Sequence, residues 1–239
     1  MLMQIKTGQL LRATENTGCL NCSANHTCLT KDMSIEEVSH FSKIIDYQKI
    51  IKKGHQLYHA GSKFDHIHIV KYGILKSSIT NTNGQEHLVG FHTPGNCMGT
   101  DGISAKSHIT DSKAIIDSVV CVIPFSKIIQ LISCSNKLKN NFIIKLSDEI
   151  SRANQNILMI SKMNADERLI YFIKNILINQ ILGKKTQASI TIPMTRNEIG
   201  QWIGVSQETI SRSFASLTKL GFLEVNGKKL ELTNISEFI

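Results

Sequence analysis

The pattern of apolar and polar positions changes along the chain, and its first regular stretch runs from about Lys49 to Phe125. Short apolar or alternating runs such as HIHIVKYGILKSSIT are separated there by glycines, and AIIDSVVCVIPF is interpreted as a further apolar strand ended by Pro124. The separating residues are Gly54, Gly61, Gly73, Gly84, Gly90, Gly95 and Gly99. Short strands with regular turn signals predict an antiparallel β barrel or sandwich.

After Pro124 the apolar positions recur every three or four residues, with no glycine or proline between them. The positions that share this spacing are Ile143, Leu146, Ile150, Ala153, Ile157 and Ile160. These six positions form a narrow apolar stripe, called the seam below. A stripe this narrow is typical of a helix paired with another helix, and we predict a coiled-coil-like homodimer. An amphipathic helix lying on the core of its own domain is the alternative interpretation.

The stretch MTRNEIGQWIGVSQETISRSFASLTKLGFLEVNGKKLELT contains the densest local signals. It follows NADERLIYFIKNIL, which starts a helix, and the polar loop KKTQAS. Thr195 and Glu198 form a capping box, which predicts a short helix to about Ile203. Gly204 and Val205 then form a tight turn.

A second helix follows, capped by Ser206 and ending near Lys219 before Gly221. Spacing around this helix places Ile210, Phe214 and Leu217 on one side and Glu208, Ser211 and Arg212 on the other. FLEV and KKLEL, joined by a turn at Asn226-Gly227, predict a hairpin wing beside it. Together these elements predict a winged helix-turn-helix that places its second helix in the major groove of double-stranded DNA.

The polar face of the second helix carries chemistry that can read bases. Arg212 can donate two hydrogen bonds to guanine, Glu208 can accept one from the cytosine amino group, and Ser211 can bond either kind of edge. The alternative is that Glu208 only stabilises the helix N-terminus and Arg212 only contacts phosphate.

Length and charge agree with a nucleic-acid partner. The chain has 239 residues, enough for two domains, and 27 Lys and Arg against 19 Asp and Glu give a formal net charge of +8. This excess favours polyanionic partners, although a merely basic protein has the same composition. No apolar run is long enough for a signal peptide core or a membrane span, so we expect a cytoplasmic protein.

Three of the six cysteines lie in CLNCSANHTC, residues 19–28. In a reducing compartment such thiols are more often metal ligands or redox sensors than disulfide partners, and passive residues are a further possibility. His26 lies in the same loop, where we expect it to face solvent. Residues alone leave the kind of metal open.

At this point the chain resembles the CRP/FNR family of bacterial transcription regulators, and within it the FNR branch of oxygen-responsive iron–sulfur proteins. The resemblance covers the chain from Cys19 to its end and rests on CLNCSANHTC, FHTPGNCMG, SVVCVIPF, SKMNADERL and MTRNEIGQWIGVSQETISR. It implies an α+β chain: an N-terminal antiparallel β-roll (a cyclic-nucleotide-binding-like jelly roll), a long dimerisation helix and a C-terminal winged helix-turn-helix. The expected boundaries are residues 1–30 for the cysteine segment, 31–136 for the β-roll sensor domain, 137–163 for the dimerisation helix and 164–239 for the DNA-binding domain.

The resemblance also implies site residues. A [4Fe–4S] cluster would be held by Cys19, Cys22, Cys28 and Cys121. A palindrome of TTGAT half-sites would be read by Glu208, Ser211 and Arg212, and the further candidates for DNA contact are Gln207, Thr195 and Arg196. The loop at residues 83–86 matches the place where family members touch RNA polymerase, although an ordinary hairpin turn explains it equally well.

The chain departs from the family pattern in places. Ala153 replaces an aspartate of the enteric FNR pattern and removes a buried like-charge repulsion, so we expect a dimer that depends less on the cluster. Thr27 stands where the family usually has a larger apolar residue, and the direction of its effect on oxygen access does not follow. Cys97 and Cys134 have no counterpart among the ligands and are predicted to be buried thiols.

Two rival functions are disfavoured. A cyclic-nucleotide pocket needs an arginine and a Gly-Glu turn, and GNCMGTDGISAKSHITDSKA has neither. A thiol redox enzyme would need C-x-x-C at a strand-to-helix junction with an acid–base constellation nearby, so we expect no enzyme. A regulator of the same fold that uses zinc, thiol redox or no effector, as a constitutive dimer, stays as the alternative.

Overall fold

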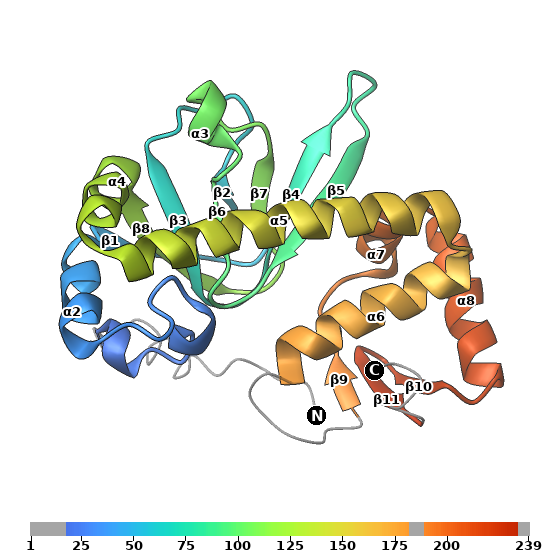
Figure 1. Cartoon of the computed structure of the whole chain (residues 1–239). Helices are drawn as coiled ribbons and strands as arrows, with labels where there is room; N and C mark the ends of the chain where they lie inside the picture. Colours follow the sequence, from blue (N-terminus) through green and yellow to red (C-terminus); the bar gives the residue numbers. More distant parts are fainter. Residues whose placement is uncertain (1–17, 182–188, 234–239) are drawn as a thin grey trace. The chain divides into compact units, whose positions relative to one another are not determined.

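The computed structural model describes residues 18–181 and 189–233 (Figure 1). It divides into two compact units, one formed by residues 1–85 and 89–151 and the other by residues 86–88 and 152–239. Apart from Ser189, the predicted loop KKTQAS lies outside the described residues. Within the described ranges every helix is too short or too polar to span a lipid bilayer.

The first unit contains the predicted antiparallel β-roll, made of two four-stranded sheets. One sheet consists, in order, of β1 (Tyr47–Ile51), β8 (Ser118–Pro124), β3 (His66–Tyr72) and β6 (Cys97–Met98). The other consists of β2 (Gln56–Tyr58), β7 (Asp111–Ala114), β4 (Leu75–Thr80) and β5 (Glu86–His92). The run AIIDSVVCVIPF therefore contains the end of β7, a turn and β8 rather than one strand, because Asp117 turns the chain and accepts a hydrogen bond from the Lys53 amide (2.8 Å).

The tight turn between β3 and β4 depends on glycine. Gly73 has a φ of +93°, a conformation that L side chains rarely adopt. A Cβ at this position would also lie 2.2 Å from the Ser118 hydroxyl of β8. A side chain at position 73 would therefore strain the backbone of this turn and collide with β8.

The alternation of side chains along β8 separates two cores. Val120 and Val122 belong to the cluster between the sheets, with Leu57, Leu75 and Met98 among its members. Cys121 and Ile123 point to the opposite face, where they pack in a second cluster with residues of the N-terminal segment and of the helices. Cys121 thus faces outward from the roll, under the N-terminal cysteine segment.

Short helices cover this outer face, and the sequence analysis did not separate them. They are α2 (Ile35–Lys43), α3 (Gly102–Ala105) and α4 (Phe125–Cys134). The start of α2 carries a readable signal, since Ser34 and Glu37 form a capping box. Helix α4 ends at Cys134, and the side chain of the following Ser135 accepts a hydrogen bond from the Leu138 amide in the first turn of the next helix.

Helix α5 (Asn136–Lys162) is the predicted long helix. Four isoleucines of the predicted seam are between 48% and 65% exposed in the single chain: Ile143, Ile150, Ile157 and Ile160. Leu146 instead packs, partly buried, against the core cluster that contains Cys121. An exposed apolar stripe of this length favours the paired-helix interpretation over a helix lying on its own core.

The second unit is a winged helix-turn-helix. Its elements are α6 (Ala165–Ile181), β9 (Ser189–Thr191), α7 (Arg196–Ile203), α8 (Gln207–Lys219), β10 (Leu223–Asn226) and β11 (Lys229–Leu232), with sheet order β10-β11-β9. The hairpin turn differs by one residue from the expectation. Asn226 pairs with Lys229, so the central residues are Gly227 and Lys228, and Gly227 supplies the positive φ of +63°.

Candidate metal centre and nucleic-acid interface

The N-terminal cysteines lie at two single-turn 3-10 helices, Cys19–Asn21 and Asn25–Thr27: Cys19 begins the first, and Cys22 and Cys28 directly follow the first and the second. Backbone bonds of the i to i+3 type hold them: Cys22 N–H donates to the Cys19 carbonyl at 3.2 Å, and Cys28 N–H donates to the Asn25 carbonyl at 3.3 Å. This compact segment folds its thiols toward the outer face of β8.

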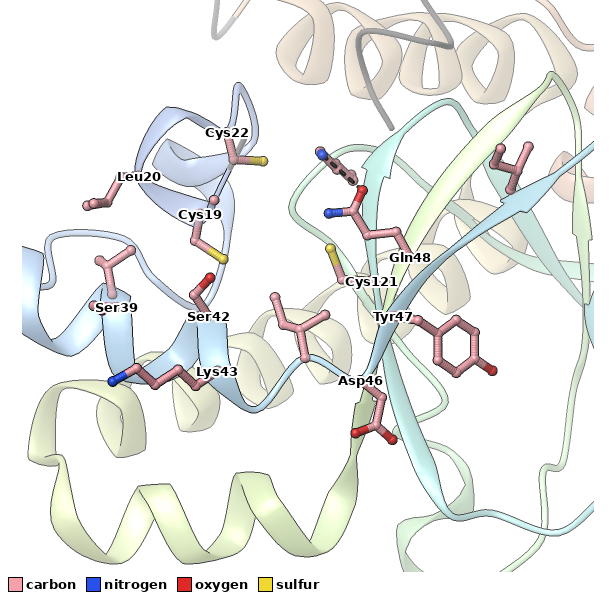
Figure 2. A pocket seen from close by; sticks show the side chains of 15 residues that line it. Cys19, Leu20, Cys22, Ser39, Ser42, Lys43, Asp46, Tyr47, Gln48 and Cys121 are labelled. Carbon is pink, nitrogen blue, oxygen red and sulfur yellow. Dashed lines mark hydrogen bonds between the residues drawn. The ribbon is translucent and has the colours of Figure 1, made fainter. Parts of the chain in front are cut away.

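All four predicted ligand cysteines line one inner hollow of about 20 Å³. Three of them, Cys19, Cys22 and Cys121, also line an adjoining pocket of about 800 Å³, and Figure 2 shows their sulfurs facing it. In the described part of the chain, no three Cys, His, Asp or Glu side chains are close enough to hold a metal ion as they stand. Chemically, the four cysteines of this lining are a donor set that fits a four-thiolate centre.

Burial controls the charge of these thiols. Desolvation raises the pKa of Cys121 to about 12 and also raises the pKa values of Cys19 and Cys28. The neighbouring thiols raise the Cys121 pKa further, because thiolates at one site repel each other. A bound metal ion must therefore displace protons, so metal binding strengthens as pH rises.

The cysteine segment is fastened to the roll and to α5. The Thr27 hydroxyl donates to the Pro94 carbonyl at 3.0 Å, where Gly95 leaves room for it. The Asn141 side-chain amide of α5 donates to the Leu29 carbonyl at 2.8 Å and to the Lys31 carbonyl at 2.9 Å. Sequence patterns gave no signal for Asn141, because its partners are backbone atoms more than a hundred residues away.

The predictions of burial for the two remaining cysteines and of solvent exposure for His26 are confirmed in two cases and wrong in one. Cys97 is buried, as predicted. The prediction that Cys134 is buried is wrong: it is exposed, because it is the last residue of α4 and lies at the open end of that helix. His26 is exposed, as expected for a loop residue.

Beside the apolar cluster between the sheets, one part of the roll is packed with aromatic and polar side chains. The Tyr58 and His108 rings stack with centroids 3.8 Å apart, and Phe64 meets the His108 ring edge-on. His108 contacts Asp101, which also accepts hydrogen bonds from the Thr110 amide and hydroxyl at 2.9 Å. This packing joins α3 and β7 to the rest of the roll.

Helix α8 presents the predicted reading face to solvent. Ser206 caps it by accepting from the Thr209 amide, while Ile210, Phe214 and Leu217 are buried. Its exposed side chains include Gln207, Glu208, Ser211 and Arg212. Arg212 and Glu208 form an ion pair of 2.7 Å with side chains 77% and 75% exposed, and the Ser211 hydroxyl donates to the Gln207 carbonyl at 3.0 Å.

Two other residues predicted to contact DNA interact with side chains or backbone of the second unit instead. The Thr195 hydroxyl caps α7 as half of a capping box with Glu198. The Arg196 guanidinium lies 3.3 Å from the Phe214 ring centroid, and its burial lowers its pKa. Both side chains therefore have structural partners within the unit, whereas the side chains of the predicted reading face of α8 are exposed.

Arg168 is a positioning residue that sequence reasoning missed. Its guanidinium donates to the carbonyls of Ile160 at 2.6 Å, Met163 at 2.9 Å and Ile203 at 2.9 Å. It thereby joins the end of α5 to the turn of the helix-turn-helix. Its place in SKMNADERL, one of the family-like stretches, was the available signal.

Comparison with known proteins agrees with this organisation. A cyclic nucleotide-binding domain profile matches residues 48–134, and a Crp-like helix-turn-helix domain profile matches residues 167–238. Electron transport regulator A of Shewanella oneidensis is 34% identical over 220 residues, covering 92% of this chain and 88% of the relative. The fumarate and nitrate reduction regulatory protein of Shigella dysenteriae is 31% identical over 230 residues, covering 95% and 92%.

Among solved structures, FixK2 from Bradyrhizobium japonicum matches with a TM-score of 0.72 and 22% identity, covering 80% of this chain and 94% of that one, which supports the fold. The relatives match most of their own length, and the two profiles match the β-roll and the winged unit separately. The chain therefore belongs to the CRP/FNR family of transcription regulators and is a DNA-binding regulator rather than an enzyme.

Proposed function

We propose that this chain is an oxygen-responsive transcription regulator that holds a [4Fe–4S] cluster and binds palindromic TTGAT-type sites as a homodimer. The ligands would be Cys19, Cys22, Cys28 and Cys121. The observation that carries the proposal is the convergence of these thiols, from segments about a hundred residues apart, on one hollow. Relatives named for anaerobic regulation and for fumarate and nitrate reduction support it.

When bound, a [4Fe–4S] cluster would supply an oxygen-sensitive link between the N-terminal segment and β8. The protein's own part is to transmit the state of that link. Leu29, directly after Cys28, is fully buried in the hydrophobic core, where the same group of packed side chains includes Leu138 and Phe142 of α5. With Asn141 holding the Leu29 and Lys31 carbonyls, a movement of the cysteine segment must disturb the start of the dimerisation helix.

At the other end of α5, Arg168 holds the Ile160 carbonyl and the Ile203 carbonyl together. Ile160 belongs to the seam, and Ile203 ends α7 just before the turn to the recognition helix. A change in how two seams pair would therefore reach the helix-turn-helix through one side chain. This is a two-state coupling in which metal and DNA both favour the paired state.

Iron and acid-labile sulfide, measured after anaerobic purification together with a visible spectrum, test the cofactor. We expect about four iron and four sulfide per chain, as the four-thiolate donor set implies. Zinc without sulfide would favour the second candidate, a zinc-dependent regulator, for which the same four thiols are suitable ligands. Thiols with no metal would contradict both.

The proposal includes RNA polymerase as a partner and excludes cyclic nucleotides. The loop at residues 83–86 lies at the tip of the β4–β5 hairpin, where residues 82–85 are exposed. The Asn81 side chain supports this turn by accepting hydrogen bonds from the Asn83 amide at 3.0 Å and the Gln85 amide at 2.9 Å. Inside the roll, the Tyr58–His108 stack takes up space, and α3 provides no arginine for a cyclic phosphate.

We expect the metal-free protein to sediment as a dimer at micromolar concentration. Ala153 adds no charge to the seam, so pairing two helices there needs no burial of like charges. Analytical ultracentrifugation of the metal-free protein measures this, with Ala153→Asp as the control that should dissociate. A monomer of the unaltered metal-free protein would contradict the expectation.

A further inference from the structure

The inner hollow contains one charged side chain besides its thiols. Its described lining consists of the four cysteines, apolar residues, Asn25, Thr30 and Lys71, and Lys71 is the only Lys, Arg, Asp or Glu among them. Lys71 also lines the adjoining larger pocket and is only 7% exposed. A lysine is rarely buried to this extent without a compensating partner.

Lys71 and Cys121 line the same two pockets. Along β3, Ile67 and Ile69 pack in the same outer core cluster as Cys121, and Lys71 is the next residue but one after Ile69. The register of β3 with β8 shifts between Val70 and Tyr72, so Lys71 lies at a bulge, a feature that often re-aims a side chain near a functional site.

Gln48 fixes the end of the Lys71 side chain. The Lys71 Nζ donates to Gln48 Oε1 at 3.0 Å, the interaction drawn at Gln48 in Figure 2. Gln48 on β1 and Ile69 on β3 are both register partners of Cys121, from its two sides. Because β8 lies between β3 and β1, the hydrogen bond from Lys71 to Gln48 crosses β8 on the face that carries the Cys121 side chain.

We propose that Lys71, positioned by Gln48, is the counter-cation of the metal centre. Four thiolates around a [4Fe–4S] core or a divalent metal ion leave a doubly charged anion, which is costly to bury without a neighbouring positive charge. Lys71 supplies that charge from the protein side. Its role rests on the proposed function for the cluster, but the electrostatic argument holds for any metal bound by the four thiols.

The test compares Lys71→Met with Lys71→Arg, which keeps the charge. Lys76→Met is the matched control: Lys76 is also 7% exposed, but it lies on β4 of the other sheet. All variants are loaded anaerobically with iron and sulfide and, separately, with cobalt(II). Metal loss to a chelator, the reduction potential of the cluster and the circular dichroism of the fold are then measured.

We expect Lys71→Met to lose iron and cobalt about 10- to 100-fold faster than the unaltered protein, the range typical of residues that support metal ligands. Its reduction potential should become more negative, because removing a positive charge disfavours the more negative reduced cluster. Lys71→Arg and Lys76→Met should stay close to the unaltered protein.

Equal metal loss from Lys71→Met and Lys76→Met, with both folded, would overturn the role of Lys71. Uptake of cobalt but not iron by the unaltered protein would overturn the iron–sulfur proposal. The rate of cobalt loss from the Lys71 variants would then still test whether Lys71 is the counter-cation of the metal centre. Uptake of neither metal would overturn both.

Discussion

Replacing Arg212 by alanine is expected to abolish sequence-specific DNA binding while leaving the fold intact. A bidentate contact to guanine contributes about 1–3 kcal/mol to discrimination, and a symmetric dimer would lose two, so Kd should rise by roughly 30-fold to 10⁴-fold. The ion pair between Arg212 and Glu208 competes only weakly with a contact from Arg212 to guanine. Exposed ion pairs contribute about 0–1 kcal/mol, and both side chains of this pair are exposed. Fluorescence anisotropy with a labelled palindromic duplex measures the change.

The control for this variant is Lys219→Ala, in the last turn of the same helix, which should change Kd little. A second duplex, with the guanine of each half-site replaced, separates base reading from phosphate contact. Arg212→Ala should no longer distinguish the two duplexes. If it weakens binding to both equally and still distinguishes them, Arg212 contacts only phosphate.

Replacing Cys121 by serine is expected to remove the metal centre. A hydroxyl is a poor substitute for a thiolate ligand, and the other three proposed ligands do not complete a four-thiolate centre without Cys121. Iron per chain after anaerobic reconstitution should fall close to zero. The metal-free variant should still fold, because serine is similar in size to cysteine, but its thermal midpoint should fall somewhat, because the serine hydroxyl is buried in the apolar cluster around position 121.

Cys134→Ser is the matched control for Cys121→Ser, because Cys134 is a cysteine on the surface at the end of α4. It should bind as much iron as the unaltered protein. If Cys121→Ser retains a full complement of iron, the fourth ligand is another residue, and the proposed link between the N-terminal segment and β8 is wrong.

The winged helix-turn-helix was predictable because its signals are local. Thr195 with Glu198 and Ser206 with Thr209 start helices α7 and α8 through contacts three residues apart, and both caps are present in the structure. The buried and exposed sides of α8 follow from helical periodicity alone. The wing turn was misplaced by one residue, because Asn226-Gly227 and Gly227-Lys228 both allow a two-residue hairpin and only strand register distinguishes them.

The metal site was less accessible from sequence because it is made by long-range packing. Cys121 was selected through a family resemblance, and its outward direction is visible only from the register of β8 against β1 and β3. Lys71 left a weak signal, a lysine within an apolar strand, whereas Asn141 left none. Cys134 was wrongly placed because α4, the helix that it ends, was not separated from the rest of the β-roll domain in the sequence analysis.

The most direct test of the account is the DNA affinity of one anaerobic sample before and after exposure to air. Anisotropy with a duplex carrying two TTGAT half-sites should show tight binding first and a higher Kd once the metal is lost. We expect an increase toward the lower end of the about 5- to 150-fold range of allosteric coupling, because Ala153 keeps part of the helix pairing. An unchanged Kd after complete loss of iron would contradict the claim that the four cysteines control DNA binding.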